Sequence, residues 1–125
     1  MILVLDASAA IATLSSGATI LEDSDAVYVP DLFVAEVTNI VWKQHRFGQL
    51  DLEACETTLD QLLRMPDVVV PSGTIFRAAF HLARTSGHSA YDMFYIALAR
   101  REDATLFTKD KALRKLAQQY KIDVV

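Results

Sequence analysis

The sequence has little of several features that would place a protein in a functional class. Its 125 residues contain one cysteine, Cys55, so an internal disulfide is excluded and a reducing compartment is compatible. No apolar run is long enough to span a bilayer or to form the core of a signal peptide. Glycine-rich phosphate loops, Gly-x-Ser-x-Gly elbows and Cys-x-x-Cys pairs are also missing. These absences predict a soluble cytoplasmic protein without a membrane partner, and they give no support to nucleotide-cofactor, serine-hydrolase or thiol chemistry.

An overall positive charge, which is typical of nucleic-acid-binding proteins, is missing too. The net charge is −4, but the charge is unevenly distributed. Residues 1–67 sum to −8 and residues 68–125 to +4. The basic residues around Asp110 are typical of a solvated helix face, and beside a carboxylate site they would also meet phosphates. The candidates for phosphate contacts are Arg100, Lys109, Lys111 and Arg114.

The residues that are present predict a folded α/β domain covering residues 1–125. Hydrophobic residues make up 52% of the chain and charged residues 22%, which favours a globule with a buried core. Short apolar runs alternate with helical patterns, and this order indicates a parallel sheet of four to five strands with helices on both faces. The expected strands are 2–5, 26–29, 68–70, 104–107 and 122–125. A first helix is expected directly after the first strand, capped by Asp6 or Ser8. The other expected helices cover 31–47, 51–65, 73–86, 90–101 and 110–120.

Helical spacing also predicts which side chains of two amphipathic helices are buried. Ser72 is expected to cap the second of them, and Gly87 to end it. The predicted inward residues are Leu52, Cys55, Leu59, Leu62 and Leu63 in the helix 51–65, and Ile75, Phe76, Ala79, Phe80 and Ala83 in the helix 73–86.

One acid interrupts the apolar and aromatic stretch AYDMFYIALA, residues 90–99. Ser89 is a candidate N-cap, so Asp92 falls in the first helical turn, where free backbone N–H groups favour a carboxylate. A lone acid at this position is most often only a first-turn acid. Its interpretation changes because other carboxylates are expected at the same end of the sheet.

Two of those carboxylates follow strands. Asp6 comes directly after the run ILVL and Asp110 comes shortly after ATLF, so both lie at the carboxyl edge of a parallel sheet, where α/β folds bind ligands. Glu36 lies at the edge of the apolar arc of its helix. There it pairs with a buried arginine or serves as a metal ligand, because an unpartnered carboxylate is costly beside apolar residues.

Four carboxylates in close proximity raise one another's pKa values, and a divalent cation relieves that repulsion. An all-oxygen set without cysteine or histidine suits Mg²⁺ or Mn²⁺. Such ions activate water and orient phosphates, so the set predicts phosphodiester hydrolysis. Ser8 and Thr108 either cap neighbouring helices or donate hydrogen bonds to a carboxylate, a water or a phosphate.

These residues together resemble a PIN domain, and in particular the small VapC-type toxins of bacterial and archaeal toxin–antitoxin pairs. The resemblance rests on VLDASA, on Glu36 after Pro30, on YDMFYIALA and on LFTKDKAL, in the same order along almost the whole chain. It implies that Asp6, Glu36, Asp92 and Asp110 bind Mg²⁺ or Mn²⁺ and that Thr108 is the small hydroxyl residue before the last acid.

The resemblance also implies an activity and partners. Family members are endoribonucleases that cut tRNA or ribosomal RNA, usually form homodimers and are covered by a cognate antitoxin. Some carry an additional acid just after the last position of the quartet, but this chain has none between Asp110 and Asp123. A fully populated second metal site is therefore not implied. The amphipathic helices, with Trp42, Phe47 and Phe80, are the expected dimer surface.

Alternative functions remain open at this point. A PIN-like fold that binds RNA or protein without catalysis has the same pattern. A ribosomal-RNA-processing enzyme is a variant of the nuclease reading. A receiver-like signalling module is also a small parallel α/β domain with acids at strand ends, but the acid near the strand 68–70, Asp67, precedes that strand.

Overall fold

Four parallel strands form the centre of the protein in the computed structural model, which describes residues 1–125. They are β1 (Ile2–Leu5), β2 (Ala26–Pro30), β3 (Val68–Val70) and β4 (Thr105–Phe107), arranged in the order β3-β2-β1-β4. In the two central pairings, Leu3 lies opposite Val27 and Thr105. The sheet confirms the predicted parallel α/β class.

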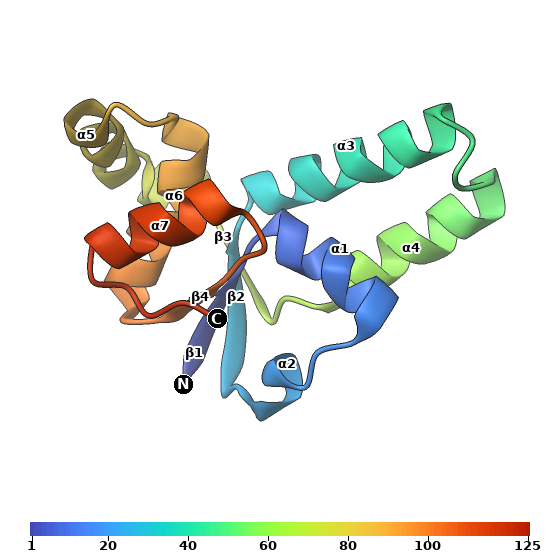
Figure 1. Ribbon diagram of the computed structural model, residues 1–125, viewed down its shortest axis with the longest axis horizontal. Helices are drawn as coiled ribbons and strands as arrows, with labels where there is room; N and C mark the ends of the chain where they lie inside the picture. Colours follow the sequence, from blue (N-terminus) through green and yellow to red (C-terminus); the bar gives the residue numbers. More distant parts are fainter.

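Helices cover both faces of this sheet (Figure 1). One layer contains α5 (Phe76–Ser86), α6 (Ala90–Glu102) and α7 (Lys111–Gln119). The other contains α1 (Ala7–Ser16), α3 (Leu32–Arg46) and α4 (Leu52–Arg64), with the short α2 (Ile20–Asp23) before β2. The helices α3 and α4 pack against each other and extend beyond the sheet. None of the helices has the length and apolar character needed to cross a lipid bilayer.

The central strand β1 is continuously apolar in sequence because both of its faces are buried. Successive side chains of a strand point to opposite faces, and both faces here are covered. Val4 packs in the cluster beneath α5, α6 and α7, whereas Leu3 and Leu5 pack in the cluster beneath α1, α3 and α4. All three are completely buried, so β1 places the residue that follows it, Asp6, in the middle of the carboxyl edge.

The predicted fifth strand is wrong, because residues 122–125 form only an isolated bridge between Val124 and Leu106. The predicted cap at Ser72 is also wrong. Residues Ser72–Thr74 form a short 3₁₀ turn and α5 begins at Phe76. The hydroxyl and the backbone N–H of Ser72 donate instead to the carboxylate of Asp31, which ties the start of α3 to the end of β3. Gly87 does end α5, in the left-handed conformation expected of a helix C-terminus.

The predicted inward faces of α4 and α5 are only partly correct. Cys55 and Leu62 of α4 are buried, as are Ile75, which directly precedes α5, and Ala79 of α5. Leu82 completes the inward stripe of α5. Four residues expected to be buried are exposed because neither the sheet nor a neighbouring helix covers them: Leu52, Leu63, Phe76 and Phe80.

The order of the strands excludes the receiver-like alternative. Receiver domains share the flavodoxin-like order 2-1-3-4-5, in which the third strand is central. Here β3 is an edge strand, paired only with β2. The residues after β3 therefore lie at the side of the sheet, away from the centre where a phosphorylated aspartate would have to be.

Two adjacent leucines of α4 provide a test of this packing. Leu62 is completely buried, whereas Leu63 is 44% exposed. We expect Leu62→Ala to lower the free energy of unfolding by about 2–5 kcal/mol because it leaves a cavity in the core. Leu63→Ala is the matched control and should change it by less than about 1 kcal/mol. Equal losses in urea unfolding would contradict the placement of α4.

Candidate active site

Asp6 lies at the centre of the carboxyl edge and is 5% exposed. It is the N-cap of α1, because Oδ1 accepts a hydrogen bond from the backbone N–H of Ala9 at 2.9 Å. The Ser8 hydroxyl donates to the same oxygen at 2.8 Å, and the Thr108 hydroxyl donates to Oδ2 at 2.5 Å. Three donors therefore fix the orientation of this buried carboxylate.

Thr108 connects Asp6 to Asp110. Thr108 is fully buried, and its Oγ1 accepts a hydrogen bond from the backbone N–H of Asp110 at 3.0 Å. The Ser8 hydroxyl likewise accepts from the backbone N–H of Lys109 at 3.0 Å. Asp110 is the N-cap of α7, and its Oδ1 accepts from the backbone N–H groups of the next helical turn. The prediction that Ser8 and Thr108 donate to a carboxylate is thus confirmed, because both hydroxyls donate to Asp6. The alternative that they cap helices is wrong, because the caps are Asp6 and Asp110, which these hydroxyls connect.

Glu36 reaches this edge from the other helical layer. It is half-buried on α3, and its Oε1 accepts a hydrogen bond from the Tyr95 hydroxyl at 2.6 Å. The expectation that a buried arginine pairs with Glu36 is wrong, since none of the ion pairs of the protein involves it. A neutral donor stabilises this carboxylate without cancelling its charge.

Asp92 lies in the first turn of α6, after the N-cap Ser89. His88, one turn earlier, places Nδ1 3.4 Å from Oδ2 of Asp92. This Nδ1 is buried and makes no hydrogen bond in the protein. His88 therefore provides weak pairing for Asp92, and the carboxylate remains about one third exposed.

The pKa values of three of these acids are raised, partly by the charges of the other acids. Burial raises the pKa of Asp6, and the charge of Asp110 raises it further. Burial likewise raises the pKa of Glu36, with additional repulsion from Asp92 and Asp6. The pKa of Asp92 is raised by burial and by Asp110, although His88 opposes the shift. Each acid thus interacts with acids from other elements, as the sequence predicted for one site.

The chemistry of the donor set fits a hard divalent cation, since all four acids offer oxygen. Two of the acids accept hydrogen bonds at only one carboxylate oxygen, Glu36 at Oε1 and Asp110 at Oδ1. The second oxygen of each makes no hydrogen bond and is available to an ion. The side chains do not yet converge, because no three His, Cys, Asp or Glu residues are arranged to hold one ion. An ion would therefore have to draw the carboxylates together from their present protein donors.

The candidate phosphate-binding residues separate into two groups. Lys109 and Lys111 flank Asp110 in the chain and are exposed, and the ammonium group of Lys109 lies over the ring of Phe107, 5.5 Å from its centroid. Arg114 is occupied elsewhere, because its Nη2 donates to the backbone carbonyls of Thr108 and Val125 at 3.0 and 2.8 Å. In that conformation Arg114 holds the C-terminal segment against β4 and has a structural role.

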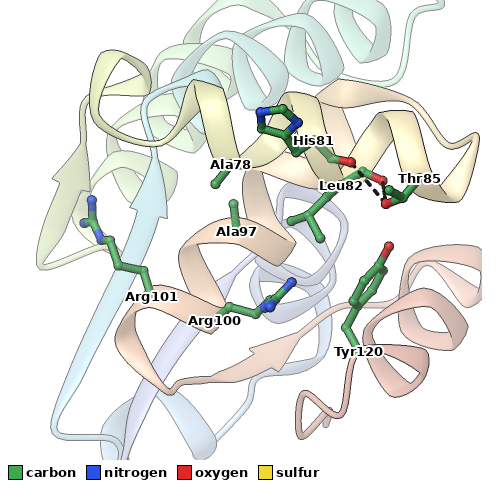
Figure 2. A pocket seen from close by; sticks show the side chains of 8 residues that line it. All are labelled: Ala78, His81, Leu82, Thr85, Ala97, Arg100, Arg101 and Tyr120. Atoms are coloured by element: carbon green, nitrogen blue, oxygen red, sulfur yellow. Dashed lines mark hydrogen bonds between the residues drawn. The ribbon is translucent and has the colours of Figure 1, made fainter.

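Arg100 lies away from the four acids. It is eight residues after Asp92 on α6, which corresponds to about 12 Å along a helix axis. Its guanidinium lies over the ring of Tyr120, 5.7 Å from the centroid. Both line a hollow of about 550 Å³ between α5 and α6, where Ala78 and Ala97 face each other (Figure 2). The full lining is Ala78, His81, Leu82, Thr85, Ala97, Arg100, Arg101 and Tyr120.

Two residues at this site, Tyr95 and His88, were missed by sequence reasoning. For Tyr95 the signal was helical spacing, because it is three residues after Asp92 on the same side of α6. His88 precedes the N-cap Ser89 and lies outside the helix, so its contact with Asp92 depends on the turn before α6. In the sequence, however, Tyr95 is one of several aromatic residues in an apolar run. Nothing in that run shows that its hydroxyl meets Glu36 of another layer.

Comparison with known proteins gives one family and several relatives. The model of the PIN domain family matches residues 3–119. Ribonuclease VapC3 of Pyrobaculum aerophilum is 30% identical over 102 residues, which cover 80% of this chain and 76% of that protein. The crystal structure of PAE2754 from Pyrobaculum aerophilum is 23% identical, with a TM-score of 0.80 over 98% of this chain and 81% of the other. VapBC2 from Rickettsia felis is 14% identical, with a TM-score of 0.69 over 100% and 98%.

The raised pKa values predict an unusual pH dependence of stability. An acid whose pKa is higher in the folded than in the unfolded state binds its proton more tightly when folded. Stability of the metal-free protein should therefore increase as the pH falls from 7 through the raised pKa values of Asp6, Glu36 and Asp92. Urea unfolding in the presence of a chelator measures this directly.

Glu36→Gln should make the metal-free protein more stable than wild type at pH 7, because the amide oxygen still accepts from Tyr95 but the charge is gone. The difference should shrink as the pH falls. Glu56→Gln, at an exposed position of α4, is the control and should show no such trend. A Glu36→Gln protein that is less stable than wild type at pH 7 would contradict the repulsion described here.

Proposed function

The chain belongs to the PIN domain family, and we propose that it is an endoribonuclease that hydrolyses RNA phosphodiester bonds with Mg²⁺ or Mn²⁺. The observation that supports this proposal is the gathering of four carboxylates from four elements at one edge of the sheet, three of them with pKa values raised by burial. The relative named as a ribonuclease supports RNA as the substrate.

Each acid has its own part in the proposed site. Asp6, Glu36, Asp92 and Asp110 would hold the metal. A bound Mg²⁺ or Mn²⁺ would supply activation of water and neutralisation of charge on the reacting phosphate. Asp6 is the most firmly oriented ligand because Ser8, Ala9 and Thr108 hold it, and it sets the centre of the site. The other three have fewer or weaker side-chain contacts and adjust to the ion.

The RNA substrate is proposed to approach along the start of α7. Lys109 and Lys111 are exposed on either side of Asp110, where their ammonium groups meet phosphates that flank the cleaved bond. Arg100 and Arg114, which the sequence also suggested, face other parts of the protein and are not assigned to this contact. The substrate class, tRNA or ribosomal RNA, follows from the family resemblance.

We further propose that the protein is the toxin of a toxin–antitoxin pair, with a cognate antitoxin as its partner in the cytoplasm. The VapC name of its relative supports the toxin assignment. VapBC2, which shares the fold, is described as bound to a DNA fragment from their promoter. For this chain, we propose that such DNA binding belongs to the antitoxin.

The removal of one metal ligand tests the activity. Asp92→Asn should abolish the cleavage of total RNA in Mg²⁺ or Mn²⁺ and leave the fold intact, because Asn keeps the shape of the side chain but loses the charge. The measurement is end-mapped RNA cleavage, with and without chelator, beside a circular-dichroism spectrum.

Asp103→Asn is the matched control for this experiment. Asp103 is exposed at the other end of the same helix, with a positive φ that asparagine also adopts readily. It should cleave like wild type. Undiminished cleavage by folded Asp92→Asn would defeat the site assignment. RNA binding without metal-dependent cleavage in the wild type would favour the non-catalytic alternative.

A homodimer is proposed through the outer face of α3. Val34 and Trp42 are 37% and 51% exposed, and they line a hollow of about 770 Å³ along that helix. They lie eight residues apart, so they form one stripe of the helix surface. An apolar stripe of this kind is typical of an interface between proteins.

Trp42→Glu should shift the protein from dimer to monomer, because the introduced charge would be buried against the partner copy. Light scattering over a range of protein concentrations measures the mass. Lys43→Glu changes the charge at the neighbouring exposed position and should leave the dimer in place. A wild-type protein that is monomeric at every concentration would rule out this dimer.

A further inference from the structure

One side chain connects the two helical layers at the acidic edge. Tyr95 belongs to α6 and is 2% exposed, with its ring in the core beneath α5, α6 and α7. Only its hydroxyl reaches the site, where it donates to Oε1 of Glu36 on α3 at 2.6 Å. This contact crosses from one layer to the other, because α3 covers the opposite face of the sheet (Figure 1).

The position of Tyr95 on α6 relates it to a second acid. Tyr95 is three residues after Asp92, so the two side chains lie on neighbouring turns of one helix face. Tyr95 therefore fixes Glu36 relative to the helix that bears Asp92.

The chemistry of the tyrosine hydroxyl suits this task. A tyrosine hydroxyl is protonated at neutral pH, and here it is buried and donates to Glu36. An arginine at this place would cancel the charge of Glu36. The hydroxyl orients the carboxylate and leaves both its charge and its Oε2 atom available.

We propose that Tyr95 is a positioning residue that holds Glu36 in the orientation needed to bind the divalent cation. The proposal rests on the function proposed above, because it requires an ion at the four acids. Without the hydroxyl, Glu36 is free to rotate towards solvent, and the ion loses one ligand from the α3 side. The direct consequence is weaker metal binding, and weaker activity follows from it only when the metal is scarce.

The experiment measures Mn²⁺ binding by calorimetry in the absence of RNA. Tyr95→Phe removes only the hydroxyl and should lower the affinity for Mn²⁺ by about tenfold, as expected when a partner of a metal ligand is removed. Tyr28→Phe is the matched control: Tyr28 packs against the same core cluster, but its hydroxyl makes no hydrogen bond to the site. It should bind Mn²⁺ like wild type.

A double-mutant cycle separates positioning from a general structural role. In the Glu36→Gln background, Tyr95→Phe should cause no further loss of affinity, because the residue through which it acts is no longer a charged ligand. RNA cleavage by Tyr95→Phe should recover when Mn²⁺ is raised to saturation. A misfolded or distorted site would not recover in this way.

A third variant covers the case in which Tyr95→Phe does not fold. Glu36→Asp, at a half-exposed position, keeps the charge but is too short to reach the hydroxyl, and it should lose Mn²⁺ affinity to a similar degree. Wild-type affinity in Tyr95→Phe, or an equal loss in the Glu36→Gln background, would overturn the positioning role and leave the proposed nuclease standing. A wild-type protein that binds no Mn²⁺ would overturn both.

Discussion

The repulsion between four carboxylates at one edge of a sheet is the constraint on which the rest of this structure depends. Asp6 is almost completely buried, and burial of a carboxylate is costly unless donors compensate it. The protein provides those donors from several elements: hydroxyls of Ser8 and Thr108 for Asp6, and Tyr95 for Glu36. The local structure at the carboxyl edge is therefore explained by the need to hold negative charge in place.

The fold makes this gathering possible through the position of β1. It is a central strand, flanked by β2 and β4, and both its faces are buried. The chain leaves β1 at Asp6 and leaves β4 shortly before Asp110, so two neighbouring strand ends deliver two acids that also cap α1 and α7. The same two carboxylates thus start helices and belong to the proposed site, so two of its four acids are helix caps.

Much of the fold and of the site was predictable from sequence because the responsible signals are local. Each strand is a short apolar run, and three of the four acids follow a strand or open a helix. Contacts between distant elements were not predictable in the same way. Ser72 looked like a cap, but its hydroxyl meets Asp31, 41 positions earlier in the chain. Helical spacing indicated which side of α5 faces the core, but not how many residues of that side are covered. Phe76 and Phe80 were therefore predicted to be buried, although they are exposed.

The donors at the acidic edge suit the proposed cation because they leave the negative charge of the acids in place. No lysine or arginine forms an ion pair with the four acids. The one ionisable basic side chain in contact with them is His88, whose Nδ1 is 3.4 Å from Oδ2 of Asp92. Hydroxyl and backbone N–H donors orient carboxylates and reduce the cost of burial, but they leave the total negative charge unchanged. Arginine in their place would stabilise the metal-free protein and weaken the attraction for Mg²⁺ or Mn²⁺. Tyr95 in particular orients Glu36 by a neutral hydrogen bond, and this is why the acidic edge remains suited to a divalent ion.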